Sequence, residues 1–149
     1  RIELVDYDYK GYWQYRGWTD IGVVKTMSRI DAPAHTGDYS LDQLEAACGQ
    51  ANLGGIAFAG DRGISRVEVS TDGGNTWRPA RLKAALSPYT WVLWMHQWRP
   101  PGQGEYTIKV RAADGSGDLR TSEERLELPD GASGYHKVVV NLIKEQPPR

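Results

Sequence analysis

A glycine-rich turn between two strand-like segments is the feature that most limits what this chain can fold into. Residues Val67–Ser70 alternate apolar and polar side chains, the turn Asp72–Asn75 (DGGN) follows, and Thr76 and Trp77 begin a return segment. Tight hairpin turns need a positive φ, which glycine adopts without steric cost. The pattern therefore predicts a β-hairpin near the middle of the chain.

Several further segments have the length and the side-chain pattern of strands. From Tyr106 to Ala112 apolar and polar residues alternate, which places the apolar ones on one face of a half-buried strand. The other segments are apolar or β-branched runs: Ile21–Ile30, Ile56–Ala59, Trp91–Trp98 and Val138–Leu142. Short strands with turn residues between them are typical of a β-sandwich, so we expect an all-β fold.

One short helix and an N-terminal arm complete the expected organisation. Ser40 is a candidate N-cap with Gln43 three residues later, as a capping box requires, so we expect a short helix over Ser40–Ala47 that Gly49 closes. The first 20 residues are rich in tyrosine and tryptophan without a helical period, which indicates an extended arm. Because the chain begins at Arg1 in a strand-like run, we expect a processed chain or a part of a longer protein.

The composition limits the classes of function. A length of 149 residues fits one domain, and a formal net charge of −1 argues against a general nucleic-acid-binding protein, which carries an excess of basic residues. One cysteine excludes an internal disulfide and a zinc site built from several cysteines. No apolar run in the sequence reaches the roughly 20 residues of a membrane-spanning helix.

The sequence shows no convincing catalytic or metal-binding motif. The three histidines are far apart and lack the spacing of metal ligands; they are His35, His96 and His136. Cys48 has no basic neighbour in the sequence that would activate its thiol. Glu123 and Glu124 are adjacent, so on a strand they would point to opposite faces rather than form a catalytic pair.

Arg62 is the residue best placed to bind a ligand. It lies in the glycine-bounded loop Gly60–Gly63, which matches neither a dinucleotide-binding fingerprint nor a phosphate-binding loop. A guanidinium is nonetheless suited to hold an anion through several donors. We therefore treat Arg62 as the candidate ligand contact.

The tryptophans in the strand-like segments allow two interpretations, a platform that stacks on sugars or anchors in the core and at interfaces. Because they alternate with apolar neighbours, we expect burial; they are Trp77, Trp91, Trp94 and Trp98. From the residues alone, the chain is a β-sandwich binding or interaction module.

An ordered set of motifs extends from Gly55 to Val138. It begins with G-x-A, continues with the arginine-bearing glycine loop and reaches RVEVS-x-DGG-x-TW at residues 66–77. The Trp91–Trp98 segment, the Tyr106–Asp114 segment and the Gly131–Val138 ending follow in order. This set resembles the C-terminal dimerisation domain of the sulfite oxidase family of molybdopterin-dependent oxidoreductases, over roughly residues 53–142.

The resemblance implies an immunoglobulin-like β-sandwich that forms a homodimer. Residues 1–20 would be an arm or linker from a molybdopterin-binding domain, and residues 21–149 the dimerisation domain. The molybdenum cofactor and its cysteine ligand would belong to that other domain. The chain itself is thus expected to hold no cofactor or metal and no catalytic residue, and Cys48 is not expected to be the ligand.

For the site, the resemblance implies that the arginine of the glycine loop, here Arg62, lines the pocket for an anionic substrate. Arg66 would be structural or interfacial. Tyr12 and Trp13 would pack on the other domain and lie exposed in this chain. Relatives act on sulfite, other oxyanions and S- or N-oxides, which leaves the substrate open. The alternative is a free-standing immunoglobulin-like module that binds carbohydrate or protein through exposed tryptophans.

Overall fold

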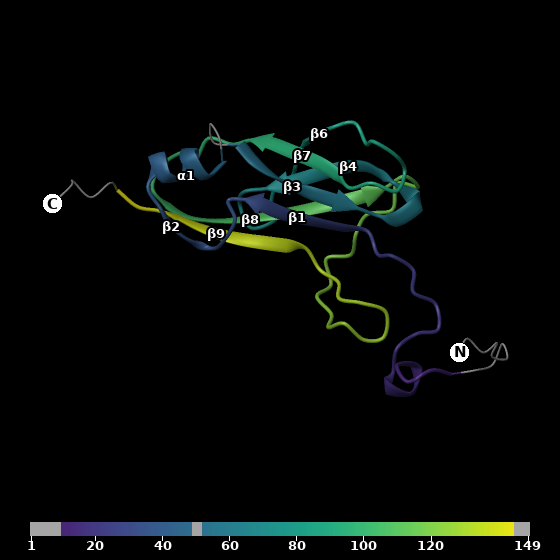
Figure 1. The fold of residues 1–149 in the computed structure, drawn as a ribbon. Helices are drawn as coiled ribbons and strands as arrows, with labels where there is room; N and C mark the ends of the chain where they lie inside the picture. Colours follow the sequence, from purple (N-terminus) through teal and green to yellow (C-terminus); the bar gives the residue numbers. More distant parts are fainter. Residues whose placement is uncertain (1–9, 49–51, 145–149) are drawn as a thin grey trace.

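Two β-sheets packed face to face form the body of the molecule (Figure 1). The computed structural model describes residues 10–48 and 52–144. One sheet has the strand order β1 (Met27–Ala32), β3 (Asn52–Phe58), β7 (Val92–Gln97) and β6 (Arg81–Leu82). The other has the order β2 (Gly37–Tyr39), β9 (His136–Leu142), β8 (Gly104–Asp114), β4 (Ile64–Ser70) and β5 (Arg78–Pro79). The pairs are antiparallel except β2 with β9, and the expected immunoglobulin-like β-sandwich is confirmed.

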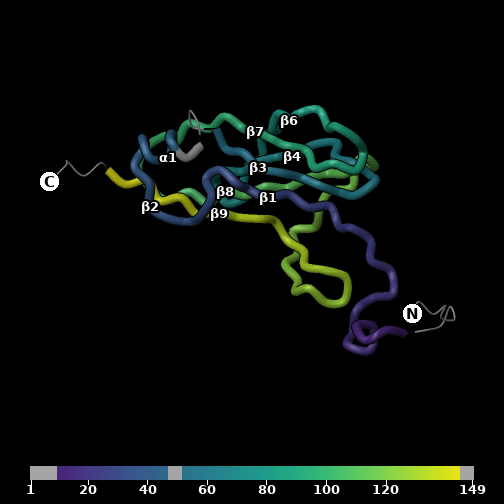
Figure 2. Tube along the Cα trace, viewed as in Figure 1, coloured from purple at the N-terminus to yellow at the C-terminus, as the bar shows by residue number. Residues whose placement is uncertain are grey.

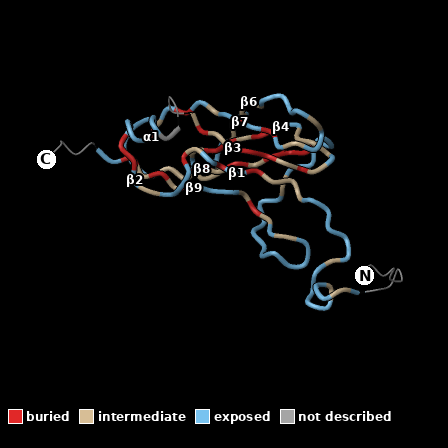
Figure 3. Tube along the Cα trace, viewed as in Figure 1, coloured by how far each residue is buried: buried red, intermediate tan, exposed pale blue. Residues whose placement is uncertain are grey.

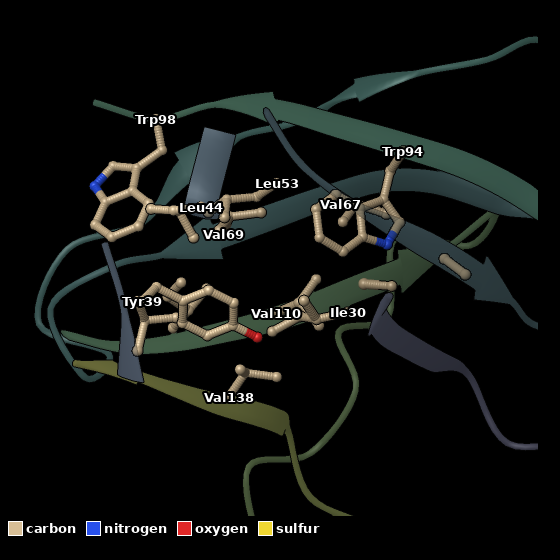
Figure 4. Close-up of a cluster of buried hydrophobic side chains, with 14 of the residues drawn as sticks. Ile30, Tyr39, Leu44, Leu53, Val67, Val69, Trp94, Trp98, Val110 and Val138 are labelled. Carbon is tan, nitrogen blue, oxygen red and sulfur yellow. The ribbon is translucent and has the colours of Figure 1, made fainter. Parts of the chain in front are cut away.

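The core lies between the two sheets, where buried residues concentrate (Figure 3). On β8 the side chains of Ile108, Val110 and Ala112 are fully buried, which confirms the alternation seen in the sequence. Trp94 reaches in from the opposite sheet and donates its indole N–H to the Ile56 carbonyl at 3.2 Å (Figure 4). Burial of these side chains, at about 25 cal/mol per Å² of apolar surface, is the main force that holds the sheets together.

The predicted hairpin is present between β4 and β5. Its turn is organised by Asp72, whose carboxylate accepts hydrogen bonds from the Thr76 backbone N–H at 2.9 Å and from the Thr76 hydroxyl at 2.6 Å. These bonds hold the pKa of Asp72 well below its ordinary value. Gly73 and Gly74 have φ of 76° and 105°, as the turn requires. The return strand begins at Arg78 rather than at Thr76, because the turn uses two more residues than predicted.

The predicted helix is also present, as α1 (Leu41–Cys48), at the end of the sandwich away from the arm (Figure 1). Ser40 and Gln43 form the capping box: each side chain accepts a hydrogen bond from the other residue's backbone N–H, at 3.2 and 2.9 Å. Leu44 is fully buried and anchors the helix on the core, whereas Leu41 is half exposed. The expected closing residue, Gly49, lies outside the described residues.

The strand expected over Ile21–Ile30 is wrong in its first half. Residues 18–26 pair with no strand, and β1 begins only at Met27 and continues to Ala32. The apolar β-branched side chains of this stretch, Ile21, Val23 and Val24, are largely exposed and join no sheet, so their strand preference is not used. The arm is not wholly extended either, since a 3₁₀ turn, η1 (Gln14–Arg16), interrupts it.

Close backbone approach explains one glycine of β3. A Cβ built on Gly55 would lie 1.9 Å from the Arg29 carbonyl oxygen on β1 and 2.9 Å from the Trp94 ring. Only glycine therefore permits the pairing of β1 with β3 over the Trp94 ring.

Among the described residues, no helix is long and apolar enough to cross a membrane.

Candidate functional site

The N-terminal segment 10–26, which we call the arm from here on, and the loop between β8 and β9 project together from one side of the sandwich (Figure 2). We call residues 115–135 the β8–β9 loop. Thr19 donates its backbone N–H to the Pro129 carbonyl at 2.9 Å, and Lys25 pairs with Asp130 at 2.8 Å. The arm and the loop enclose, together with Arg62, a cleft of about 420 Å³, which we call the arm cleft.

Arg62 lies in this cleft, at the end of the 3₁₀ turn η2 (Gly60–Arg62) that joins β3 to β4. Its Nε donates to the Asp114 carboxylate at 2.8 Å. Its Nη2 donates to the Val24 carbonyl at 2.8 Å and to the Thr26 hydroxyl at 3.3 Å. Only Nη1 has no hydrogen-bond partner within residues 10–48 and 52–144, so the guanidinium offers one nitrogen to a ligand instead of paired donors.

Asp114 fixes the position of Arg62. Its side chain is buried, and besides Arg62 it accepts backbone N–H bonds from Ser116 at 3.0 Å and Asp118 at 3.1 Å. The hydrogen bond from Arg62 is the main reason that the pKa of Asp114 lies below its ordinary value. Asp114 is thus a charged anchor that joins β8, η2 and the arm.

Arg120, in the β8–β9 loop, is a second guanidinium in the arm cleft that the sequence did not single out. Its Nη1 donates to the Thr26 carbonyl at 2.6 Å and its Nε to the Gly134 carbonyl at 2.5 Å. In the described part of the chain it pairs with no carboxylate, and burial lowers its pKa. Sequence reasoning missed Arg120 because an arginine in a polar loop is common, and no neighbouring residue indicates that it lies in a cleft.

The remaining candidates from the sequence do not come together. His35 stacks on Tyr39, His96 faces the Pro79 carbonyl, and His136 accepts the Ile30 backbone N–H. Within the described ranges, no group of three His, Cys, Asp or Glu residues is arranged to hold a metal ion. The side chain of Cys48 lies outside what the structure describes.

The charged residues that the sequence analysis considered besides Arg62 form ion pairs on the surface. Glu123 and Glu124 are exposed and lie 3.6 Å from Arg125 and Lys137, respectively. Arg66 is exposed and lies 3.9 Å from Glu68. Exposed pairs of this kind contribute little to stability, and none of them forms a site.

The four tryptophans expected to be buried differ in their exposure. Trp94 and Trp98 are buried, as predicted, and Trp77 is half buried beneath the Arg111 guanidinium, which lies 4.1 Å from its ring. Trp91 is 61% exposed, so its predicted burial is wrong: it lies just before β7, outside the core.

Exposed apolar side chains include two groups that lie close together in the chain. The first is the β7 outer face, which we define as Trp91, Leu93 and Met95. The second is on the arm, where Tyr12 and Trp13 are each 62% exposed, as predicted. Contiguous exposed apolar side chains mark surfaces that contact a partner.

The comparisons with known proteins give the class of the domain. The model of the Mo-co oxidoreductase dimerisation domain matches residues 19–142. The chain therefore belongs to the Mo-co oxidoreductase dimerisation domain family.

Individual relatives agree with this. Sulfite oxidase of Gallus gallus is 36% identical over 116 residues, covering 73% of this chain and 25% of that protein. Mitochondrial sulfite oxidase of Macaca fascicularis is 31% identical over 114 residues, covering 72% of this chain and 21% of that protein. The chain thus spans between a fifth and a quarter of the length of these relatives.

A solved structure shares the fold. The sulfane dehydrogenase SoxCD from Paracoccus pantotrophus superposes with a TM-score of 0.57 at 21% identity, covering 82% of this chain and 33% of that chain. At this identity the similarity establishes the architecture alone.

Proposed function

We propose that this chain is the dimer-forming domain of a larger molybdenum-dependent oxidoreductase that acts on a small anionic substrate such as sulfite. The observation that carries this proposal is the family match over residues 19–142, together with relatives that are named sulfite oxidases. In this assignment the molybdopterin and the cysteine that ligates the metal belong to another domain of the larger protein. Residues 1–20 would lead from that domain, and the chain alone would not be catalytic.

Within this function, Arg62 lines the substrate pocket. Two features support the role: Arg62 lies in a cleft of about 420 Å³, and Asp114 and Val24 fix its guanidinium while its Nη1 keeps two N–H groups for a ligand. Arg120 adds a positive charge to the same cleft that no carboxylate of the described residues pairs with, whereas Lys25, which also lines it, is bound to Asp130. A charge-assisted hydrogen bond from a fixed donor favours a compact anion over a neutral molecule.

The homodimer forms, in this proposal, through the β7 outer face. The family is named for dimerisation, and a twofold-symmetric interface brings the same surface of both copies together. Trp91, Leu93 and Met95 give this surface the apolar and aromatic character that is typical of homodimer interfaces.

The test of the Arg62 role is steady-state kinetics of the larger protein with sulfite as substrate. Arg62→Lys keeps a positive charge beside buried Asp114, so the fold is retained, but it removes the fixed Nη1 donor. We expect KM for sulfite to rise about tenfold, with the dimer intact.

Arg66→Lys is the matched control, because Arg66 is exposed and lies outside the arm cleft. An Arg62→Lys enzyme that is folded and dimeric, with KM and kcat like those of the Arg66→Lys enzyme, would exclude Arg62 from the substrate pocket.

A further inference from the structure

A second cleft, separate from the proposed dimer surface, lies between β1 and the end of the β8–β9 loop. It has a volume of about 590 Å³, and we call it the β1 cleft. Arg120 lines both this cleft and the arm cleft. The charged side chains around the β1 cleft are three arginines and one glutamate: Arg29, Arg120, Arg125 and Glu124.

The charge of Arg120 lacks a counter-charge. Its Nε and Nη1 are held by the carbonyls of Gly134 and Thr26, which neutralise no charge. Nη2 has no acceptor, and no Asp or Glu lies within ion-pair distance, among residues 10–48 and 52–144. The half-buried guanidinium of Arg120 has lost part of its hydration and has no anion beside it. A bound anion would compensate for this loss of solvation free energy.

His136 adds a hydrogen-bond donor to the same cleft. Its Nδ1 accepts the Ile30 backbone N–H at 3.2 Å, so in the neutral ring the proton is on Nε2. Nε2 has no acceptor in the described part of the chain. Burial, with the charges of Arg29 and Arg120, lowers the pKa of His136, and only Asp31 opposes them.

The other groups that face the cleft do not cancel this positive field. Asp31 is bound by the Arg29 Nε at 2.6 Å, so it neutralises Arg29 and leaves Arg120 unpaired. Glu124 lies 3.6 Å from Lys137, and Arg125 lies 3.6 Å from Glu123. Ser28, which also lines the cleft, has a buried hydroxyl without a hydrogen-bond partner. The cleft thus holds more donors and positive charge than this chain satisfies.

We propose that the β1 cleft binds an oxyanion, either a tetrahedral anion of the sulfate kind or a carboxylate, with Arg120 as the charged contact and the His136 Nε2–H as the second donor. The proposal does not depend on the molybdenum-enzyme assignment, because all of its residues belong to this chain. Its ligand contacts Arg120 from the β1 side, whereas the proposed substrate contact is Arg62 in the arm cleft.

The experiment uses this chain and follows the ring resonances of all three histidines by NMR as pH is varied. Titrations are run in sodium chloride, sodium sulfate and sodium acetate at equal ionic strength. An anion beside His136 stabilises its protonated form, so we expect its pKa to rise by about 0.5 to 1 unit in sulfate or acetate relative to chloride. His35 and His96, which line neither cleft, are internal controls and should shift equally in the three salts.

The two anions distinguish the ligand class. A larger shift with sulfate identifies a tetrahedral oxyanion site, and a larger shift with acetate identifies a site for a carboxylate. If His136 shifts no more than His35 and His96 in either salt, the proposal is overturned.

Variants assign the effect to Arg120. Arg120→Gln should abolish the anion-dependent shift of His136, whereas Arg66→Gln, an exposed arginine outside the cleft, should leave it unchanged. Should Arg120→Gln fail to fold because two carbonyls lose their donor, Arg120→Lys retains the charge and should reduce the shift without abolishing it. A shift in the Arg120→Lys or Arg120→Gln chain as large as in the parent chain contradicts the assignment.

Discussion

At the scale of single residues, the charged pair of Arg62 and Asp114 joins the arm to the sandwich beside the arm cleft. Asp114 is buried at the end of β8, and Arg62 is held by it at 2.8 Å. The same guanidinium binds the Val24 carbonyl, so the arm is joined to the sandwich through this pair. Removal of one partner leaves the other charge without compensation in a poorly solvated site, which costs more than the loss of an exposed ion pair.

This pair predicts a dependence of stability on pH. The pKa of Asp114 is lower in the folded state than in the unfolded state, mainly because Arg62 donates a hydrogen bond to it. The stabilisation is therefore present at pH values above the ordinary aspartate pKa of about 4 and is lost as the pH falls through the lower folded value.

The measurement is urea unfolding of Asp114→Asn at pH 7 and at pH 3. At pH 7 we expect a free energy of unfolding about 2 kcal/mol below that of the parent chain, and a smaller difference at pH 3. Asp61→Asn is the matched control, since Asp61 is exposed in the adjacent turn. Equal losses for the two variants at pH 7 would show that the Arg62–Asp114 pair does not stabilise the fold.

At the scale of elements, local patterns in the sequence predicted the parts that local physics determines. The alternation of β8, the glycine turn after β4 and the Ser40–Gln43 capping box were all correct, because each depends on residues close in sequence. β2 and β6 were missed, since runs of three and two residues are strands only through their pairing with β9 and β7. The β-branched residues before Met27 predicted a strand that is absent, because no neighbouring strand pairs with them.

The candidate site was predictable to a similar extent. Arg62 was singled out from its loop and from the family resemblance, and it lies in the arm cleft; its contact with a substrate stays a prediction. The bonds that occupy its Nε and Nη2 join residues up to 52 positions apart and could not be predicted. Arg120 was missed because its contact with the Thr26 carbonyl joins residues 94 positions apart, and nothing in its neighbourhood marks it. The burial of Trp91 was predicted wrongly, because alternation shows which side chains share a face of a strand but not whether that face is covered.

The pairing of β1 with β3 gives a prediction at this scale. Gly55→Ala would place a methyl group 1.9 Å from the Arg29 carbonyl oxygen, so the two strands must separate. We expect the free energy of unfolding to fall by about 2 kcal/mol or more, measured by thermal or urea unfolding.

Gly102→Ala is the control for this effect, because nothing lies within 4 Å of the Cβ that it would add. If Gly55→Ala were as stable as Gly102→Ala, the close approach of β1 to β3 would be refuted.

At the scale of the whole molecule, the exposed apolar side chains include those of the arm and those of the β7 outer face. In the proposed function each has its own partner: Tyr12 and Trp13 contact the molybdopterin-binding domain, and the β7 outer face contacts a second copy of this domain. The chain spans only a fifth to a quarter of its sulfite oxidase relatives, so surfaces that need partners are expected on it. In the proposed function, dimerisation through the β7 outer face connects the family, the fold and this surface.

Sedimentation velocity of this chain over a range of concentrations measures whether the β7 outer face forms the dimer. Leu93 is half exposed in the middle of the β7 outer face, so a carboxylate there would be buried without a partner in the dimer. We expect a concentration-dependent dimer for the parent chain and for Leu126→Glu, which changes an exposed leucine in the β8–β9 loop, and a monomer for Leu93→Glu. A parent chain that stays monomeric at all concentrations, or a Leu93→Glu chain that dimerises as tightly as the parent, would contradict this expectation.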